Sequence, residues 1–222
     1  MVINPSLEAY ELSRLFGGGR QGFSRSLNTK VERYKVALTT LAEPRLHYRI
    51  KKVDNVGKGF VSIQGGTTFR SLKLSQALKD SGEIVCFVAT IGIAIEDEII
   101  QLMAKNRLSE AYVLDAMGSV AVENVVEQFY RRKEAEFAAQ NKSVTLRFSP
   151  GYCDWPVTEQ KKLFGLFGSE STGVELLDSC LMQPRKSISG VFGLFHTANP
   201  RTSLPYNPCQ RCKKIDCIAR RI

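Results

Sequence analysis

The hydrophobic and polar positions along this 222-residue chain predict helices and strands that are separated by glycine and proline turns. Apolar residues recur every three or four positions where helices are expected, and they alternate or run on without a break where strands are expected. The expected helices span residues 4–16, 27–41, 71–81, 93–104, 110–139 and 158–167. The expected strands span residues 47–53, 60–63, 83–91, 144–146, 174–176 and 188–195. This series predicts an α+β fold, with a mostly antiparallel sheet and covering helices.

Two segments have the strongest patterns. Residues 83–91 are almost uniformly apolar, which is typical of a central strand that is covered on both faces. Within this strand, Cys86 is expected to be a small core residue and not a nucleophile. Residues 110–139 form the longest helical pattern, in which apolar side chains from Leu114 to Phe129 recur at spacings of three and four. We therefore expect a central strand and a long helix with one apolar face.

Composition does not divide the chain. No internal repeat and no shift in composition marks a boundary, so residues 1–222 are predicted to form a single domain. This domain would carry an N-terminal helical extension (about 1–45) and a cysteine-rich C-terminal tail (about 205–222). The triple glycine Gly17–Gly19 is expected to be a linker, because no strand precedes it and no Lys-Ser or Lys-Thr pair follows at phosphate-loop spacing.

Hydrophobic residues make up 43% of the chain and charged residues 24%, as in ordinary soluble globular proteins. The apolar runs are too short to span a membrane, and the first residues do not form a signal peptide, so a cytoplasmic location is expected. The net charge of +9 would suit binding to nucleic acid or to an acidic protein partner. The alternative is a basic surface that is only solvated. Nucleic acid is the less favoured partner, because the basic residues are dispersed and no binding signature accompanies them.

The densest local signal lies in residues 146–156, which read Leu-Arg-Phe-Ser-Pro-Gly-Tyr-Cys-Asp-Trp-Pro. A strand leads in, Pro150 and Gly151 break it, and Thr158 is expected to cap the helix that follows. A backbone exposed by glycine and proline, with an arginine at its entrance, suits a small polar ligand. The alternative is a structural turn in which Tyr152 and Trp155 pack in the core.

The pattern Arg147-x-x-Pro150-Gly151-Tyr152-x-x-x-Pro156 resembles the Arg-x-x-x-Gly-Tyr-Pro signature of the activation domain of cobalamin-dependent methionine synthase. Two further stretches are similar to the same family, and they are Asp115–Ser119 and Leu181–Ser187. Short, stand-alone relatives of the domain look most similar to this chain. The fused domain has proline directly after the tyrosine, where this chain has Cys153, and no counterpart is found for the upstream acidic residue that the fused domain uses for the ligand's amino group.

The resemblance implies a function. The family domain binds S-adenosylmethionine, and the carried-over ligand contacts are Arg147, Ser149, Pro150, Gly151 and Tyr152. Arg147 would pair with the ligand carboxylate, backbone groups of residues 149–151 would bind adenine or ribose, and Tyr152 would face the sulfonium or the polar tail. No catalytic side chain is implied, because cobalamin on a partner protein supplies the chemistry. The chain would act in trans to reactivate a cobalamin-dependent methionine synthase, with electrons from a flavodoxin-like or ferredoxin-like donor.

Three of the six cysteines lie near the C-terminus as Cys209-x-x-Cys212-x-x-x-x-Cys217. Thiolates at this spacing are typical of ligands to zinc or to an iron–sulfur cluster, and a fourth ligand would come from Cys180, Cys153 or His196. The alternative is a reduced tail or an opportunistic disulfide. A second hypothesis for the whole chain is therefore a metal or iron–sulfur redox protein that serves another corrinoid methyltransferase.

Overall fold

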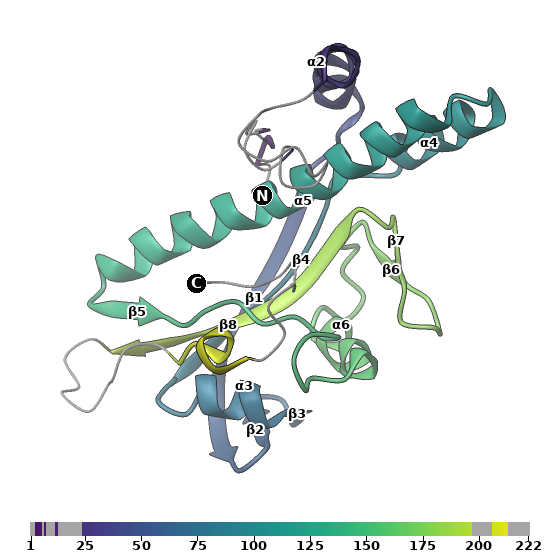
Figure 1. Cartoon of the computed structure of the whole chain (residues 1–222). Coiled ribbons are helices and arrows are strands. Elements are labelled where there is room, and N and C mark those ends of the chain that lie inside the picture. Colours follow the sequence, from purple (N-terminus) through teal and green to yellow (C-terminus); the bar gives the residue numbers. More distant parts are fainter. Residues whose placement is uncertain (1–2, 6, 8–11, 13–23, 197–205, 213–222) are drawn as a thin grey trace. The chain divides into compact units, whose positions relative to one another are not determined.

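The structure, a computed structural model, describes residues 3–5, 7, 12, 24–196 and 206–212 (Figure 1). Most of the expected helix 4–16, the triple glycine and Cys217 lie outside these ranges. The chain divides into two compact units, each built from three separate segments. The first unit comprises Met1–His47, Val88–Arg131 and Glu170–Ile188, and the second comprises Tyr48–Phe87, Arg132–Ser169 and Ser189–Ile222.

The first unit is mainly helical. Its helices are α2 (Arg25–Leu41), α4 (Ala94–Ala104) and the larger part of α5 (Leu108–Ala138). Helix α2 begins where the Ser24 side chain accepts a hydrogen bond from the Leu27 backbone N–H at 3.3 Å. Two short strands, β6 (Glu175–Leu176) and β7 (Met182–Gln183), pair antiparallel.

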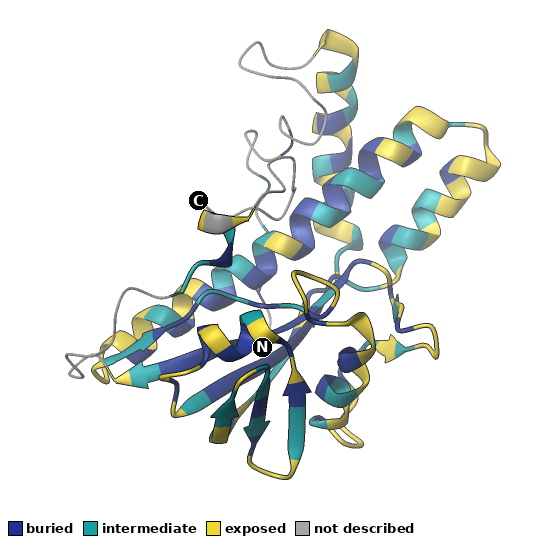
Figure 2. Ribbon diagram, turned by 60° about the horizontal axis from the view of Figure 1, so that its bottom comes forward, coloured by how far each residue is buried: buried dark blue, intermediate teal, exposed yellow. Residues whose placement is uncertain are grey.

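A six-stranded sheet has the strand order β3-β2-β1-β4-β8-β5. Its strands are β1 (Arg45–Gly57), β2 (Phe60–Ile63), β3 (Thr67–Arg70), β4 (Glu83–Thr90), β5 (Lys142–Val144) and β8 (Ser187–His196). The pairs β1–β2, β2–β3 and β5–β8 are antiparallel. Every residue of β4 after Glu83 is buried, as the continuous apolar run predicts for an interior strand (Figure 2).

The second unit holds most of this sheet and three short helical segments. These are α3 (Leu72–Ala77), the 3-10 turn η1 (Val157–Glu159) that leads into α6 (Gln160–Gly165), and the 3-10 turn η2 (Pro208–Arg211). Helix α3 contacts β2, and α6 contacts β3. Ser71 caps α3, because its hydroxyl accepts a hydrogen bond from the Leu74 N–H at 2.9 Å.

The predicted α+β fold, with a mostly antiparallel sheet and covering helices, is confirmed. One cap is wrong: the chain enters η1 from Pro156, and Thr158 lies inside the 3-10 turn without capping it. Strand β3 was not expected, because its four residues Thr67–Arg70 carry little apolar alternation. It forms through a tight hairpin with β2, in which Gly65 and Gly66 take φ values of +99° and +83° that only glycine adopts readily.

Candidate functional site

The candidate loop is attached to β8 before it turns. The backbone N–H of Thr145 donates to the Gly193 carbonyl at 2.9 Å. Phe148 and Val191 then exchange two backbone hydrogen bonds of 2.8 Å each, which form an isolated antiparallel bridge. Arg147 therefore projects from a segment whose backbone is fixed on both sides.

Gly190 allows this close approach. A Cβ atom at this position would lie 2.6 Å from the Phe148 carbonyl oxygen and 2.9 Å from the Ser149 hydroxyl oxygen. The first of these contacts is to backbone, which does not move aside as the end of a flexible side chain does. Glycine at 190 is thus a condition for the position of Arg147 and Ser149.

Beyond Ser149 the chain makes a compact turn. The Tyr152 N–H donates to the Ser149 carbonyl at 3.2 Å, and the Gly151 N–H donates to the Trp155 carbonyl at 2.8 Å. Gly151 has φ +89°, and Cys153 has φ +57° although it carries a side chain. A non-glycine residue in the left-handed region costs about 1 kcal/mol or more, so the turn is held by its surroundings.

The two aromatic residues of the turn have different roles. Trp155 is 2% exposed and lies edge-on to Phe69, with ring centroids 5.3 Å apart. Tyr152 is 48% exposed. The structural alternative therefore holds for Trp155, whereas Tyr152 is presented at the surface of its unit.

The five residues predicted to bind ligand lie in one continuous segment of the second unit. Arg147 and Ser149 are half-buried, Pro150 is buried, and Gly151 and Tyr152 are exposed. The arginine thus lies at the half-buried end of the segment and the tyrosine at its exposed end. Such an arrangement suits a ligand with an anionic group at one end and a larger polar body.

Asp154 anchors the loop, and sequence reasoning did not single it out. Its carboxylate accepts hydrogen bonds from the Ser71 hydroxyl at 2.7 Å, from the Leu72 N–H at 2.7 Å and from the Lys73 N–H at 3.1 Å. Burial opposes ionisation of this carboxyl, but the hydrogen bonds from Ser71 and from the two amides outweigh it and lower the pKa of Asp154. The loop is therefore tied to the N-terminus of α3, a contact between residues more than 80 positions apart.

Replacing Asp154 with alanine is expected to lower the free energy of unfolding by about 1–2 kcal/mol at neutral pH, as for the loss of a helix cap. Because folding lowers the pKa of Asp154, its stabilisation is present above the ordinary carboxyl pKa of about 4 and is lost as the pH falls through the folded value. Urea unfolding at pH 7 and pH 3 checks this. The difference between wild type and variant should shrink at pH 3.

The control is Asp80→Ala, since the carboxylate of Asp80 lies 3.8 Å from the Lys79 ammonium and anchors no loop. Its effect should be small at both pH values, because exposed ion pairs of this kind contribute about 0–1 kcal/mol. A constant Asp154→Ala deficit at both pH values would contradict the assignment of the stabilisation to the ionised carboxylate.

In the first unit, the two other stretches that resemble the family meet. The buried Lys186 ammonium donates to Asp115 at 2.8 Å and to the Ser119 hydroxyl at 2.9 Å. A Cβ on Gly118 would lie 3.3 Å from Lys186 Cε, so glycine leaves room for the lysine stem. The Lys186 backbone N–H donates to Glu96 at 3.1 Å, which also fixes the main chain here. The resemblance in these stretches thus has a structural basis in one polar cluster.

The cysteine tail is described up to Cys212. Turn η2 begins after Asn207, whose side-chain oxygen accepts a hydrogen bond from the Cys209 N–H at 2.9 Å. Cys209 is half-buried and Cys212 is exposed. Among the described residues no three His, Cys, Asp or Glu side chains are arranged to hold a metal ion. The predicted ligand set of Cys209, Cys212 and Cys217 therefore stays a prediction.

Two of the remaining cysteines are buried. Cys86 lies in β4, and its complete burial raises its pKa to about 12, as expected for a core residue. Cys180 is buried in the first unit.

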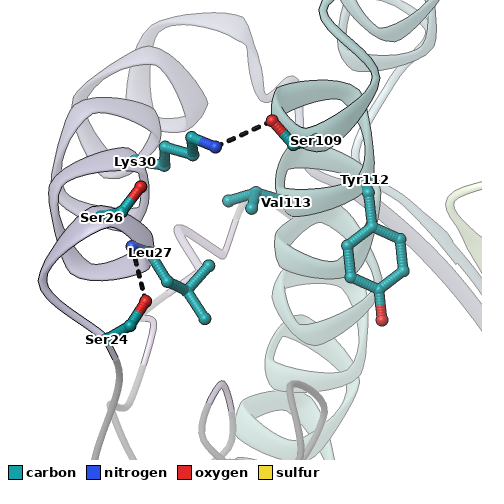
Figure 3. Close-up of a pocket in the computed structure, with 7 residues that line it drawn as sticks. All are labelled: Ser24, Ser26, Leu27, Lys30, Ser109, Tyr112 and Val113. Carbon is teal, nitrogen blue, oxygen red and sulfur yellow. Dashed lines mark hydrogen bonds between the residues drawn. The ribbon is translucent and has the colours of Figure 1, made fainter.

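One shallow pocket lies between α2 and α5 and is lined by Ser24, Ser26, Leu27, Lys30, Ser109, Tyr112 and Val113 (Figure 3). It contains none of the predicted ligand contacts, and the Lys30 ammonium already donates to Ser109 within it at 2.8 Å.

The structure is an α+β domain in which a loop with Arg147 and the Gly151–Tyr152 turn is hydrogen-bonded to strand β8. The family model of the vitamin B12 dependent methionine synthase activation domain matches residues 75–202, and the chain belongs to this family. The matched range includes the Arg147 loop and the Lys186 cluster but ends before the cysteine tail.

A solved structure is similar to this chain over much of its length. It is the crystal structure of the MetH reactivation domain bound to AdoHcy, with a TM-score of 0.61 and 18% sequence identity. The similarity covers 81% of this chain and 66% of that chain. At this level of identity the likeness concerns the fold. No curated protein matches the sequence.

None of the helices in the described ranges combines the length and the apolar character that crossing a bilayer requires.

Proposed function

We propose that this chain binds S-adenosylmethionine and supports the reductive reactivation of a cobalamin-dependent methionine synthase, acting in trans on the protein that carries the cobalamin. The observation that supports this most directly is the loop itself. Arg147 and Tyr152 stand at opposite ends of a segment that β8 holds in place, and the segment lies inside the range matched by the activation-domain family.

The proposed contacts follow from the chemistry of the ligand. The guanidinium of Arg147 would pair with the carboxylate of the methionine moiety through two parallel hydrogen bonds. Backbone groups of Ser149, Pro150 and Gly151 would bind the adenine or ribose edges. The exposed ring of Tyr152 would lie against the sulfonium or donate its hydroxyl to the polar tail.

The chain's part in the reaction would be binding and orientation. Cobalamin on the partner would supply the metal that accepts the methyl group. A flavodoxin-like or ferredoxin-like donor would supply one electron to that cobalt, the methyl group would pass from the ligand's sulfur to the cobalt, and S-adenosylhomocysteine would be released. This chain would present the methyl group and exclude competing nucleophiles, and its basic surface would suit docking to an acidic partner.

Two measurements test the proposal. Calorimetric titration of S-adenosylmethionine into the purified chain should show saturable binding. A cobalamin-dependent synthase that lacks its own activation domain and has an oxidised cobalt should then regain activity when this chain, S-adenosylmethionine and a chemical reductant are added together. Omitting any one of the three should leave the synthase inactive.

A chemical reductant makes the result independent of the natural donor. No binding of S-adenosylmethionine would remove the proposed function and leave only the family and the fold. Binding without recovery of the synthase would argue against methionine synthase as the partner.

A second candidate is a metal or iron–sulfur redox protein that serves another corrinoid methyltransferase. It is favoured by Cys209, which lies in the 3-10 turn η2, and Cys212, which directly follows this turn. Under this hypothesis the chain would hold zinc or an iron–sulfur cluster without affinity for S-adenosylmethionine. Cys212→Ser would then remove the metal, whereas under the first proposal it would leave ligand binding unchanged.

A further inference from the structure

Strand β3 stands at one end of the strand order, so one of its edges has no neighbouring strand in the part of the chain that the structure describes. Two side chains of the η1–α6 segment bind the main chain of this strand. The Glu159 carboxylate accepts a hydrogen bond from the Arg70 N–H at 2.9 Å. The Lys162 ammonium donates to the Thr68 carbonyl at 2.9 Å. Main-chain groups two residues apart point to the same side of a strand, so the two side chains bind the edge of β3 as a further strand would.

These two side chains also bind each other. The Lys162 ammonium lies 2.6 Å from the second carboxylate oxygen of Glu159, whose side chain is only 10% exposed. A buried carboxylate is costly unless its oxygens are paired, and here each oxygen has a partner. A buried ion pair adds little stability over apolar residues of similar size, but its directional hydrogen bonds fix the groups that it joins. This pair therefore fixes the orientation of η1 and α6 on β3.

Turn η1 connects this attachment to the candidate loop. Val157, two residues before Glu159, lies against Gly151, because a Cβ atom on Gly151 would be 3.8 Å from the Val157 Cβ. The Gly151 N–H also donates to the Trp155 carbonyl at 2.8 Å. Gly151 and the adjacent Tyr152 are both proposed ligand contacts. The position of this end of the ligand segment therefore depends on where β3 holds η1.

The loop is held on the same side by further contacts with residues 68–73. The Phe69 ring lies edge-on to Trp155, with centroids 5.3 Å apart, and residues 71–73 donate three hydrogen bonds to Asp154. Strand β8 holds the beginning of the ligand segment at Phe148. The segment is thus supported at both of its ends.

We propose that Glu159, paired with Lys162, is a positioning residue for the Gly151–Tyr152 end of the ligand segment. The carboxylate is buried and acts through η1, without touching the ligand. The inference rests on the proposed function, because the segment that Glu159 positions is the one proposed to bind S-adenosylmethionine. Ligand affinity then depends on a carboxylate that is not among the ligand contacts.

Trp155 makes the position of the loop measurable, because it is the only tryptophan of the chain and is 2% exposed. Glu159→Ala should shift the fluorescence emission of Trp155 to longer wavelength and increase its quenching by acrylamide. The same variant should weaken S-adenosylmethionine binding by about tenfold, the lower end of what the loss of a hydrogen bond to a charged group costs. Glu159→Gln keeps an oxygen for the Arg70 N–H but loses the ion pair, so both readouts should lie between those of wild type and the alanine variant.

Ser62→Ala is the matched control, because the Ser62 hydroxyl lies 2.9 Å from the Thr68 hydroxyl within the same β2–β3 hairpin. This variant removes one side-chain hydrogen bond from the hairpin and leaves in place the main-chain groups that bind Glu159 and Lys162. Trp155 emission and ligand affinity should stay at their wild-type values. Circular dichroism of each variant checks the fold.

Two results would overturn the proposal. One is a folded Glu159→Ala chain with the emission and quenching of wild type, and the other is a changed emission at unchanged ligand affinity. If Glu159→Ala does not fold, Lys162→Ala decides in its place, and wild-type values of both readouts in that variant would overturn the proposal. A wild-type chain that binds no S-adenosylmethionine would remove the proposed function, and the Trp155 readout would then still decide whether Glu159 holds the loop.

Discussion

Replacing Arg147 with alanine is expected to weaken S-adenosylmethionine binding by roughly 30- to 150-fold. This corresponds to about 2–3 kcal/mol, the usual effect of removing one partner of a charge-assisted, partly buried pair. The effect should be large because Arg147 is half-buried and its neighbours Thr145 and Phe148 are hydrogen-bonded to β8, so its backbone is held in place before the ligand arrives. Calorimetric titration of wild type and variant measures the ratio of the dissociation constants.

Arg147→Lys separates charge from geometry. Lysine keeps the positive charge but cannot offer two parallel hydrogen bonds to a carboxylate, so its affinity should lie between those of wild type and alanine. Arg131→Ala is the matched control for net charge, because the Arg131 side chain is 66% exposed and pairs with Glu127 at 2.8 Å. Equal losses in the Arg131 and Arg147 alanine variants would show that the ligand responds to overall charge and not to a specific arginine.

The elements that follow from local pattern were predictable from the sequence. The apolar run of residues 83–91 became β4 (Glu83–Thr90), and the long periodic stretch became α5 (Leu108–Ala138). In both, the pattern is long enough for one period to dominate. Strand β3 was missed because its four residues carry little apolar alternation, and its existence depends on pairing with β2.

The sequence predicted which segment forms the candidate site, but it did not predict which distant residues hold that segment in place. Glycine and proline at 150–151 indicate the turn, whereas the partner of Asp154 lies at the start of α3, 82 positions away from Leu72. The same limit applies to Lys186 and Ser119, which are 67 positions apart. Such contacts are set by how the elements pack, and residue spacing along the chain contains no record of them.

The different burial of Tyr152 and Trp155 could not be predicted from the sequence either, although both residues lie in the same turn. Both are aromatic residues of one turn, and residue type alone suggests the same burial for both. The edge-on contact with Phe69 decides that Trp155 is buried. Tyr152 remains exposed.

Gly190→Ala is expected to destabilise the chain by about 2–4 kcal/mol. The new methyl group would lie 2.6 Å from the Phe148 carbonyl oxygen, so either the loop segment or β8 has to move. The movement would also strain or break the two hydrogen bonds between Phe148 and Val191, each contributing about 1 kcal/mol. Urea unfolding monitored by circular dichroism measures the loss.

Gly165→Ala is the matched control. Gly165 is the last residue of α6, no atom lies within 4 Å of its added Cβ, and alanine is a better helix former by up to about 1 kcal/mol. This variant should be as stable as wild type or slightly more stable. If Gly190→Ala and wild type had the same free energy of unfolding, the contact between the loop and β8 would not contribute to stability.

The same pair of variants tests how far ligand binding depends on the attachment of the loop. If β8 orients Arg147, a Gly190→Ala chain that is still folded should bind S-adenosylmethionine more weakly, although residue 190 is not among the proposed ligand contacts. The Gly165→Ala chain should bind it like wild type. A folded Gly190→Ala chain that binds S-adenosylmethionine as tightly as wild type would show that Arg147 binds the ligand without the support of β8. The position of the ligand contacts would then depend on the turn at Gly151 and Tyr152 alone.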